Sequence, residues 1–120
     1  MRTIQVPTFA DHRGQLSVID TILPFEIKRV YYIYHATQPR GGHRHHKTIQ
    51  ALICVSGSCE ILVNNGQEES IIVLDSAQKC VIIFPQDWHV MQAFSHDAVL
   101  LVLASEHFDA DDYIDEPYPQ

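Results

Sequence analysis

The sequence predicts an all-β protein, either a sandwich or a barrel. About ten short apolar segments of strand length follow one another, and turn residues separate them at close intervals. None of these segments repeats its apolar residues with the period of a helix. This combination is typical of antiparallel strands that close around a core.

The expected strands cover residues 3–6, 16–19, 28–35, 59–63, 70–74, 80–84, 88–94 and 99–104, with a histidine-bearing strand that continues through 49–55. A turn is expected at 11–15, where Gly14 is free to take a positive φ, and a hairpin at the Asn-Asn-Gly of 64–66. Residues 109–114 are expected to form one helical turn, with acidic residues matching the helix dipole. Residues 116–120 are expected to be either a flexible tail or the start of a linker to a further domain.

The bulk composition favours a single cytoplasmic domain over residues 1–120. A chain of 120 residues with 46% hydrophobic content is enough for one core. The sequence has no apolar run long enough to span a membrane, and its first residues lack the apolar core of a signal peptide. Cys54, Cys59 and Cys80 lie in apolar segments, which predicts buried free thiols in a reducing compartment.

The charge distribution indicates a small anionic ligand. A net charge of -7 argues against nucleic-acid binding, which needs a basic surface. However, residues 27–59 contain no Asp or Glu, and five of the eight Lys and Arg residues lie there. A local excess of cations in an acidic protein suits an anion. The alternative is that these cations only form a solvated face.

A cluster of histidines follows Arg40 and two glycines. Because side chains alternate along a strand, His43 and His45 should share one face, while His46 should point away. Burying several ionisable groups costs free energy, so such a cluster is uncommon where it serves no function. Two imidazoles on one face, close to an arginine, therefore indicate a functional site.

Two kinds of chemistry suit such a site. With His89 from a neighbouring strand, the pair would make a three-histidine metal site, but Gln50 stands where a divalent ion would prefer a carboxylate. Alternatively, a histidine with a pKa near 6.5 is a natural base for a proton next to a carbonyl group. The resulting enediolate needs positioned donors, which tyrosine, arginine and histidine supply without a metal.

The segment Arg40-Gly41-Gly42-His43-x-His45 resembles a motif of the nucleotide-sugar 3,4-ketoisomerases. These are small cupins related to the C-terminal part of certain fused sugar-modifying proteins. Further similar segments occur at 11–16, 24–33, 52–59, 88–91, 102–105 and 112–114, so that the resemblance covers nearly the whole chain. It implies a cupin fold, a jelly-roll β-barrel.

The resemblance also implies an activity and its residues. The family moves the ketone of dTDP-4-keto-6-deoxyglucose from C4 to C3 without metal or organic cofactor. The catalytic residues would be His43, His45 and Tyr32, with either histidine as the base. The residues expected to bind the nucleotide sugar are Arg40, Arg29, Lys47, Gln50, Trp88, His89 and Arg13. A homodimer that exchanges N-terminal strands would bring Arg13 to the site of the partner.

Three alternatives stay open at this point. The Arg-Gly-x-His element also occurs in dTDP-sugar 3,5-epimerases, which would leave the ketone at C4. A metal-dependent cupin is the second, although the usual Pro-x-Gly-x-x-His segment is here shortened to residues 85–89 and lacks its glycine. The third is a module that binds a sugar nucleotide without turning it over.

Overall fold

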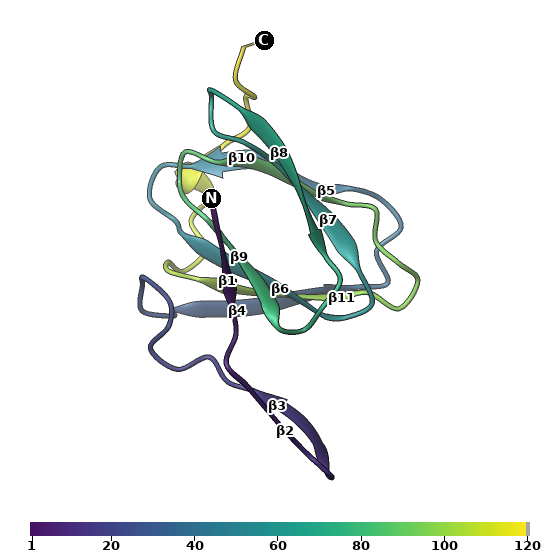
Figure 1. Cartoon of the computed structure of the whole chain (residues 1–120). Helices are drawn as coiled ribbons and strands as arrows, with labels where there is room; N and C mark the ends of the chain where they lie inside the picture. The colour runs from purple at the N-terminus through teal and green to yellow at the C-terminus, as the bar shows by residue number, and fades with distance from the viewer. Residues whose placement is uncertain (120) are drawn as a thin grey trace.

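Two antiparallel sheets face each other and form a barrel (Figure 1). The computed structural model describes residues 1–119. The first sheet has the order β1-β9-β6-β11-β4 and the second has the order β12-β5-β10-β7-β8. The elements are β1 (Arg2–Gln5), β2 (Thr8–Asp11), β3 (Gly14–Ser17), β4 (Arg29–Tyr34), β5 (Arg40–His45), β6 (Gln50–Ser56), β7 (Cys59–Asn64), β8 (Glu69–Leu74), β9 (Lys79–Ile83), β10 (Trp88–Gln92), β11 (Val99–Ala104), the 3₁₀ helix η1 (Ala110–Asp112) and β12 (Tyr113–Ile114). The all-β prediction is confirmed, and no helix in the described residues is long and apolar enough to cross a membrane.

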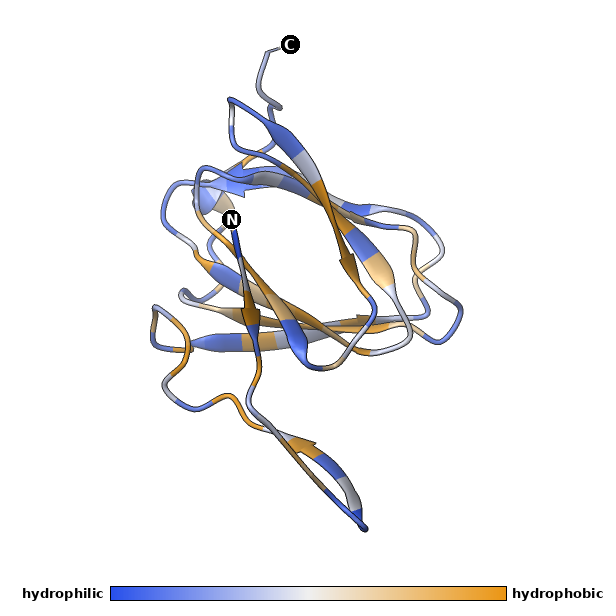
Figure 2. Cartoon of the chain, viewed as in Figure 1, coloured by the Kyte–Doolittle hydropathy of each residue, from blue (hydrophilic) through white to orange (hydrophobic). Residues whose placement is uncertain are grey.

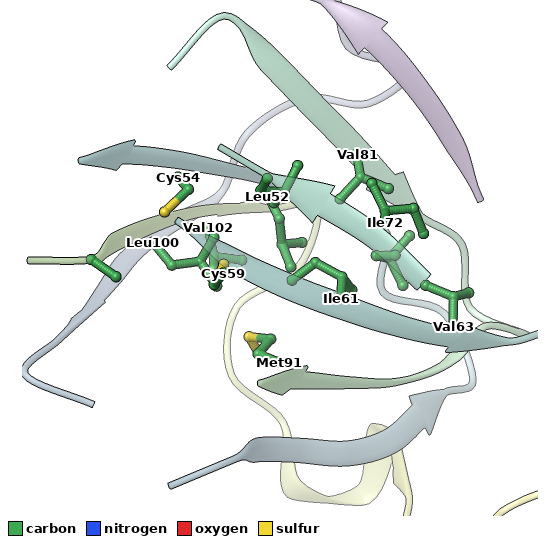
Figure 3. Packing of buried hydrophobic residues seen from close by; sticks show 13 residues of the cluster. Leu52, Cys54, Cys59, Ile61, Val63, Ile72, Val81, Met91, Leu100 and Val102 are labelled. Carbon is green, nitrogen blue, oxygen red and sulfur yellow. The ribbon is translucent and has the colours of Figure 1, made fainter. Parts of the chain in front are cut away.

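The main core lies between the two sheets (Figure 3). Leu52, Val102 and Val81 come from the first sheet, and Ile61 and Met91 from the second. These side chains alternate with outward ones along their strands, as expected for a face-to-face packing. A second apolar cluster covers the outer face of the first sheet, so that β6 is buried on both sides from residue 50 to residue 54.

The histidine-bearing strand does not continue into the apolar strand that follows it, and this expectation was wrong. β5 ends at His45 and belongs to the second sheet, whereas β6 begins at Gln50 in the first. The loop between them is held by Asp112, whose carboxylate accepts hydrogen bonds from the backbone N–H of Lys47 and the hydroxyl of Thr48. This break depends on a residue far along the chain, so the local pattern does not reveal it.

The hairpin of β2 and β3 projects from the barrel (Figure 1). Its two strands pair only with each other. Phe9 and Leu16 lie opposite one another across the hairpin and are 67% and 58% exposed. In Figure 2, orange segments on this projecting hairpin mark its hydrophobic residues. A two-stranded hairpin with an exposed apolar pair has little stability of its own in water.

The C-terminal residues contact the outer face of the second sheet. The hydroxyl of Tyr118 donates a hydrogen bond to the carbonyl oxygen of Gln86 at 2.8 Å, and the guanidinium of Arg44 lies 4.4 Å from its ring centroid. Tyr118 is thus in contact with β5 and with the turn before β10, and the expectation of a flexible tail stays a prediction. Gln120 lies outside the described residues.

The three cysteines are free and buried, as predicted. Burial raises the pKa of the Cys59 thiol to about 12 and that of Cys80 to about 11. The thiolate is the reactive form of cysteine, so these two thiols are inert near neutral pH.

Candidate active site

Three histidine rings meet on the inner face of the second sheet. β5 carries His43 and His45, and β10 places His89 opposite His43. The ring centroid of His43 lies 5.1 Å from that of His45 and 5.2 Å from that of His89, and the remaining pair is 6.0 Å apart. His45 and His89 are buried. This arrangement confirms the prediction that His43 and His45 share a face and that His89 lies next to them on a neighbouring strand.

The glycines before His43 allow β5 to approach β10 closely. Gly41 has a φ of +91°, and a Cβ atom there would lie 3.1 Å from the carbonyl oxygen of His89. Gly42 also has a positive φ, of +81°. The pairing of β5 with β10 shifts register between His89 and Val90, as at a β-bulge. Gly41 therefore helps to bring His89 against His43.

Burial keeps these imidazoles neutral. The pKa of His45 is lowered to about 4, mainly by loss of solvent and also by the neighbouring His43 and Arg29, while Asp112 opposes this shift. Burial likewise lowers the pKa of His89 to about 3. The pKa of His43 is also lowered, mainly by burial and against the charge of Asp115. At neutral pH all three rings are therefore uncharged and can accept a proton.

Several buried polar atoms of the site have no hydrogen-bond partner in the protein. They are both ring nitrogens of His45, Nε2 of His89 and Oε1 of Gln50. Nδ1 of His89 lies 3.1 Å from the carbonyl oxygen of Asp87, which can only accept, so Nδ1 carries the proton and Nε2 is an acceptor. Buried polar atoms are normally paired. This set therefore suits a ligand that offers hydroxyl and carbonyl groups.

Tyr31 faces the barrel interior, whereas Tyr32, the tyrosine expected to be catalytic, faces outward. Tyr31 packs against the main core and accepts a hydrogen bond from Nε2 of Gln50 at 3.2 Å. Tyr32 faces the other way, is 62% exposed and stacks on Tyr34 on the outer face of β4. Burial raises the pKa of the Tyr31 hydroxyl, Tyr113 raises it further, and Arg29 and Arg40 act against this. Neighbouring residues of a strand face opposite ways, which excludes Tyr32 from this interior.

Trp88 also lies away from the histidines, in contrast to the expectation that it lines the pocket. Its neighbour His89 faces the interior, so Trp88 faces outward, beside Gly42. The indole N–H donates a hydrogen bond to the carbonyl oxygen of Asp115 at 3.3 Å. Trp88 therefore connects β10 to the C-terminal residues on the outer face.

Tyr113 contacts the histidines although the sequence did not single it out as a site residue. β12 pairs with β5 so that Tyr113 lies opposite His45. Its ring centroid is 4.8 Å from that of His45 and 4.7 Å from that of His43, in edge-to-face contact with both. A two-residue strand has no periodicity that could have predicted this pairing.

The cations divide into those near the site and those away from it. The guanidinium of Arg29 lies 4.5 Å from the ring centroid of Tyr31, and Arg40 begins β5 and acts on the pKa of the same tyrosine. Lys47 is exposed and pairs with Asp109 at 3.6 Å. Arg13 lies on the projecting hairpin, where it pairs with Asp11 at 2.6 Å. Within one chain, then, Lys47 and Arg13 are not brought to the histidines.

The donors of the site do not form a metal-binding group. Among residues 1–119, no three His, Cys, Asp or Glu side chains are arranged to hold a metal ion. Gln50, the nearest substitute for a carboxylate, is buried and directs its amide nitrogen to Tyr31.

A family model described as WxcM-like, C-terminal matches residues 1–118. A curated relative is the TDP-4-oxo-6-deoxy-alpha-D-glucose-3,4-oxoisomerase of Aneurinibacillus thermoaerophilus. It is 41% identical over 117 residues, which are 94% of this chain and 84% of the relative.

The chain is also similar to solved structures of 3,4-ketoisomerases. A double mutant of the QdtA 3,4-ketoisomerase from Thermoanaerobacterium thermosaccharolyticum, in complex with TDP, is 43% identical with a TM-score of 0.92, over 96% of this chain and 86% of that one. The WlaRB TDP-quinovose 3,4-ketoisomerase from Campylobacter jejuni is 39% identical with a TM-score of 0.91, over 96% and 92% of the two chains. The rmlC epimerase of Mycobacterium tuberculosis has a TM-score of 0.78 at 17% identity, over 92% of this chain and 66% of that one, which shows the fold alone.

Proposed function

Because the chain belongs to the WxcM-like, C-terminal family and its relatives are 3,4-ketoisomerases with the cupin fold, we propose that it is a dTDP-4-keto-6-deoxyglucose 3,4-ketoisomerase. It would move the ketone from C4 to C3 in the biosynthesis of a deoxyamino sugar. One observation carries this proposal. Two imidazoles that burial keeps neutral, His43 and His45, share one face of the barrel interior, and both nitrogens of His45 are unpaired in the protein.

The reaction needs two proton transfers at carbon. One of His43 and His45 removes the proton from C3, the C–H electrons form a C3–C4 double bond, and the C4 oxygen takes up a proton. The enediol then loses the proton of its C3 oxygen, the C3 ketone forms, and C4 receives a proton. A neutral imidazole is required for the first step, and lowered pKa values supply it at neutral pH.

Protons must also move between the two oxygens. Tyr31 offers a hydroxyl group on the inner face of the first sheet, and its hydrogen bond from Gln50 fixes its position. We assign the oxygen-to-oxygen transfer to Tyr31 together with the histidine that is not the base. The unpaired Oε1 of Gln50 would accept a hydrogen bond from a sugar hydroxyl, and Nε2 of His89 would accept another.

Arg40 and Arg29 would bind the diphosphate. Arg40 is exposed at the start of β5, and Arg29 is half-buried on β4, beside Tyr31. Guanidinium groups bind phosphate oxygens through paired N–H donors. Their positions beside Tyr31 would keep the sugar near the histidines while the nucleotide extends outward.

We further propose a homodimer in which the β2–β3 hairpins are exchanged. The exposed pair Phe9 and Leu16 needs cover, and β4 is the edge strand of its sheet, with the apolar surfaces of Val30 and Tyr32 exposed beside it. Such an edge can accept a strand from another chain. Exchange would carry Arg13 to the partner barrel.

The buried, reduced cysteines agree with a cytoplasmic protein.

Deuterated water tests the activity. The protein is incubated with dTDP-4-keto-6-deoxyglucose, and the product is examined by NMR and mass spectrometry. A 3-keto product with deuterium at C4 is expected. Deuterium at C3 and C5 with the ketone still at C4 would select an epimerase, and tight binding of dTDP without any exchange would select a binding module. Activity that is lost to a chelator and restored by a metal would overturn the metal-free mechanism.

A mixing experiment tests the exchanged dimer. His45→Asn and Arg13→Ala should each be poorly active if every site combines His45 of one chain with Arg13 of the other. In a mixture refolded together, about a quarter of the sites would contain both native residues, so about a quarter of wild-type activity should return. A mixture no more active than its components, or a wild-type chain that sediments as a monomer, contradicts the exchange.

A further inference from the structure

The C-terminal segment, residues 109–118, is attached to the second sheet at several points. The backbone N–H of His46 donates to the carbonyl oxygen of Asp112 at 3.0 Å. The Asp112 carboxylate, which is 4% exposed, accepts from the N–H of Lys47 at 2.8 Å and from Thr48. Burial raises the pKa of this carboxyl, but the hydrogen bonds outweigh burial and the pKa is lowered. Asp112 is therefore an ionised anchor, immediately before Tyr113.

Tyr113 is the residue that this anchor directs into the barrel. Cross-strand partners in an antiparallel pair point to the same face, and Tyr113 is the partner of His45. Its ring touches both His43 and His45 at similar centroid distances, 4.7 and 4.8 Å, and at the same interplanar angle of 66°. One aromatic ring thus contacts both imidazoles of the proposed base pair.

The orientation of the His45 ring depends on packing and not on hydrogen bonds to the protein. Neither ring nitrogen of His45 has a hydrogen-bond partner in the protein. By contrast, Nδ1 of His89 is bonded to a carbonyl oxygen. The ring of His45 is therefore oriented by packing against His43, His89 and Tyr113.

We propose that Tyr113 is a positioning residue of this site, whose ring holds the His43 and His45 imidazoles in their working orientation and keeps water from one side of them. This proposal rests on the proposed function for its kinetic consequence, but not for its effect on the histidines. The ring is the working part, through edge-to-face contacts of the kind that aromatic groups favour. Asp112 acts through Tyr113, because it fixes the backbone from which that ring projects.

Tyr113→Leu and Tyr113→Phe separate the ring from the hydroxyl. The leucine removes the aromatic contacts and admits water, so the pKa values of His43 and His45 should rise by about 1 unit. Asp115 faces His43, while Asp112 and Arg29 face His45, and none of these is changed. A misplaced base should also lower kcat by about 10-fold or more, with KM changed much less. The phenylalanine should behave as wild type in both measurements.

NMR titration of the histidine ring protons is the primary measurement, since it needs no substrate. Tyr118→Ala is the matched control, because Tyr118 belongs to the same segment and contacts Arg44 instead of a histidine. It should lower the melting temperature without moving the histidine titrations. If Tyr118→Ala moves them as far as Tyr113→Leu does, loosening of the whole segment is the cause and the assignment to the ring is overturned.

Two further outcomes would also overturn the proposal. Unchanged titration curves in a folded Tyr113→Leu protein would show that the ring does not shape the environment of the histidines. A Tyr113→Phe variant as slow as Tyr113→Leu would make the hydroxyl a catalytic group instead. If the titrations move as expected but the wild-type protein does not isomerise the sugar, the positioning role stands and only the proposed function fails.

Discussion

The hydroxyl oxygen of Tyr31 lies 3.2 Å from Nε2 of Gln50, inside the barrel and between two strands of the first sheet. β4 and β6 are not neighbours in that sheet, since β11 lies between them. The hydrogen bond therefore crosses above β11 on the inner face. It fixes both side chains on the side that faces the histidines.

This pair predicts different results for two adjacent tyrosines. Tyr31→Phe removes the hydroxyl assigned to oxygen-to-oxygen transfer, so kcat should fall by about 100-fold. Tyr32→Phe is the matched control and should keep most of the activity, because Tyr32 lies on the outer face of β4. Steady-state kinetics on dTDP-4-keto-6-deoxyglucose compares the two. A greater loss in Tyr32→Phe would restore the role that the resemblance suggested for it.

Most of the barrel could be predicted from local sequence patterns. Strict alternation in β7 and β10 and the apolar run of β11 follow from the two-residue period of a strand. The break between β5 and β6 could not be predicted in this way. It depends on Asp112, which holds residues 47 and 48 from a distant part of the chain. The sheet to which a strand belongs depends on the strands with which it pairs, and a local sequence pattern does not identify those partners.

The site shows the same division. The shared face of His43 and His45 follows directly from alternation. Alternation also separates Tyr31 from Tyr32, but only the packing shows that Tyr31 is the inward one. The contact of Tyr113 with both histidines needed the pairing of a two-residue strand. The unpaired nitrogens of the site appear only when every neighbour is in place.

The histidine pair can be separated by isotope exchange. His43→Asn and His45→Asn should each lose at least about 100-fold in kcat. In deuterated water, the variant without the base should leave the C3 proton of the substrate untouched. The other variant should still exchange it while forming little 3-keto product. His46→Ala is the matched control, since its side chain is exposed and adjacent. Equal exchange at C3 in both variants would contradict a single base.

Acid should destabilise the fold through its buried histidines. The folded pKa values of about 4 for His45 and about 3 for His89 lie below the ordinary 6.5, so the unfolded chain binds protons that the folded chain does not. Stability is therefore fully present above pH 6.5 and falls as the pH drops toward 4, by up to about 1.4 kcal/mol per pH unit for each histidine. Urea unfolding at several pH values measures this slope.

Substitution of His89 should change the pH dependence of the unfolding free energy, and not only its value at neutral pH. His89→Gln removes one of the three imidazoles whose pKa burial lowers, so the fall in unfolding free energy between pH 6.5 and 4.5 should become less steep. His12→Gln, on the exposed turn of the hairpin, is the control. If His89→Gln and the wild-type protein lose stability in parallel over this range, His89 is not buried as a neutral ring.

Gly41→Ala should damage both the fold and the site. The φ of +91° is unfavourable for alanine, and the new Cβ would press on the carbonyl oxygen of His89 from 3.1 Å. A loss of about 2 kcal/mol in unfolding free energy is expected, together with a lower kcat because His89 must shift. Gly14→Ala is the control, since its φ is also positive but a Cβ there would meet nothing within 4 Å. It should cost less stability, and an equal loss in both variants would show that backbone conformation alone, and not the approach of β5 to β10, explains the glycine.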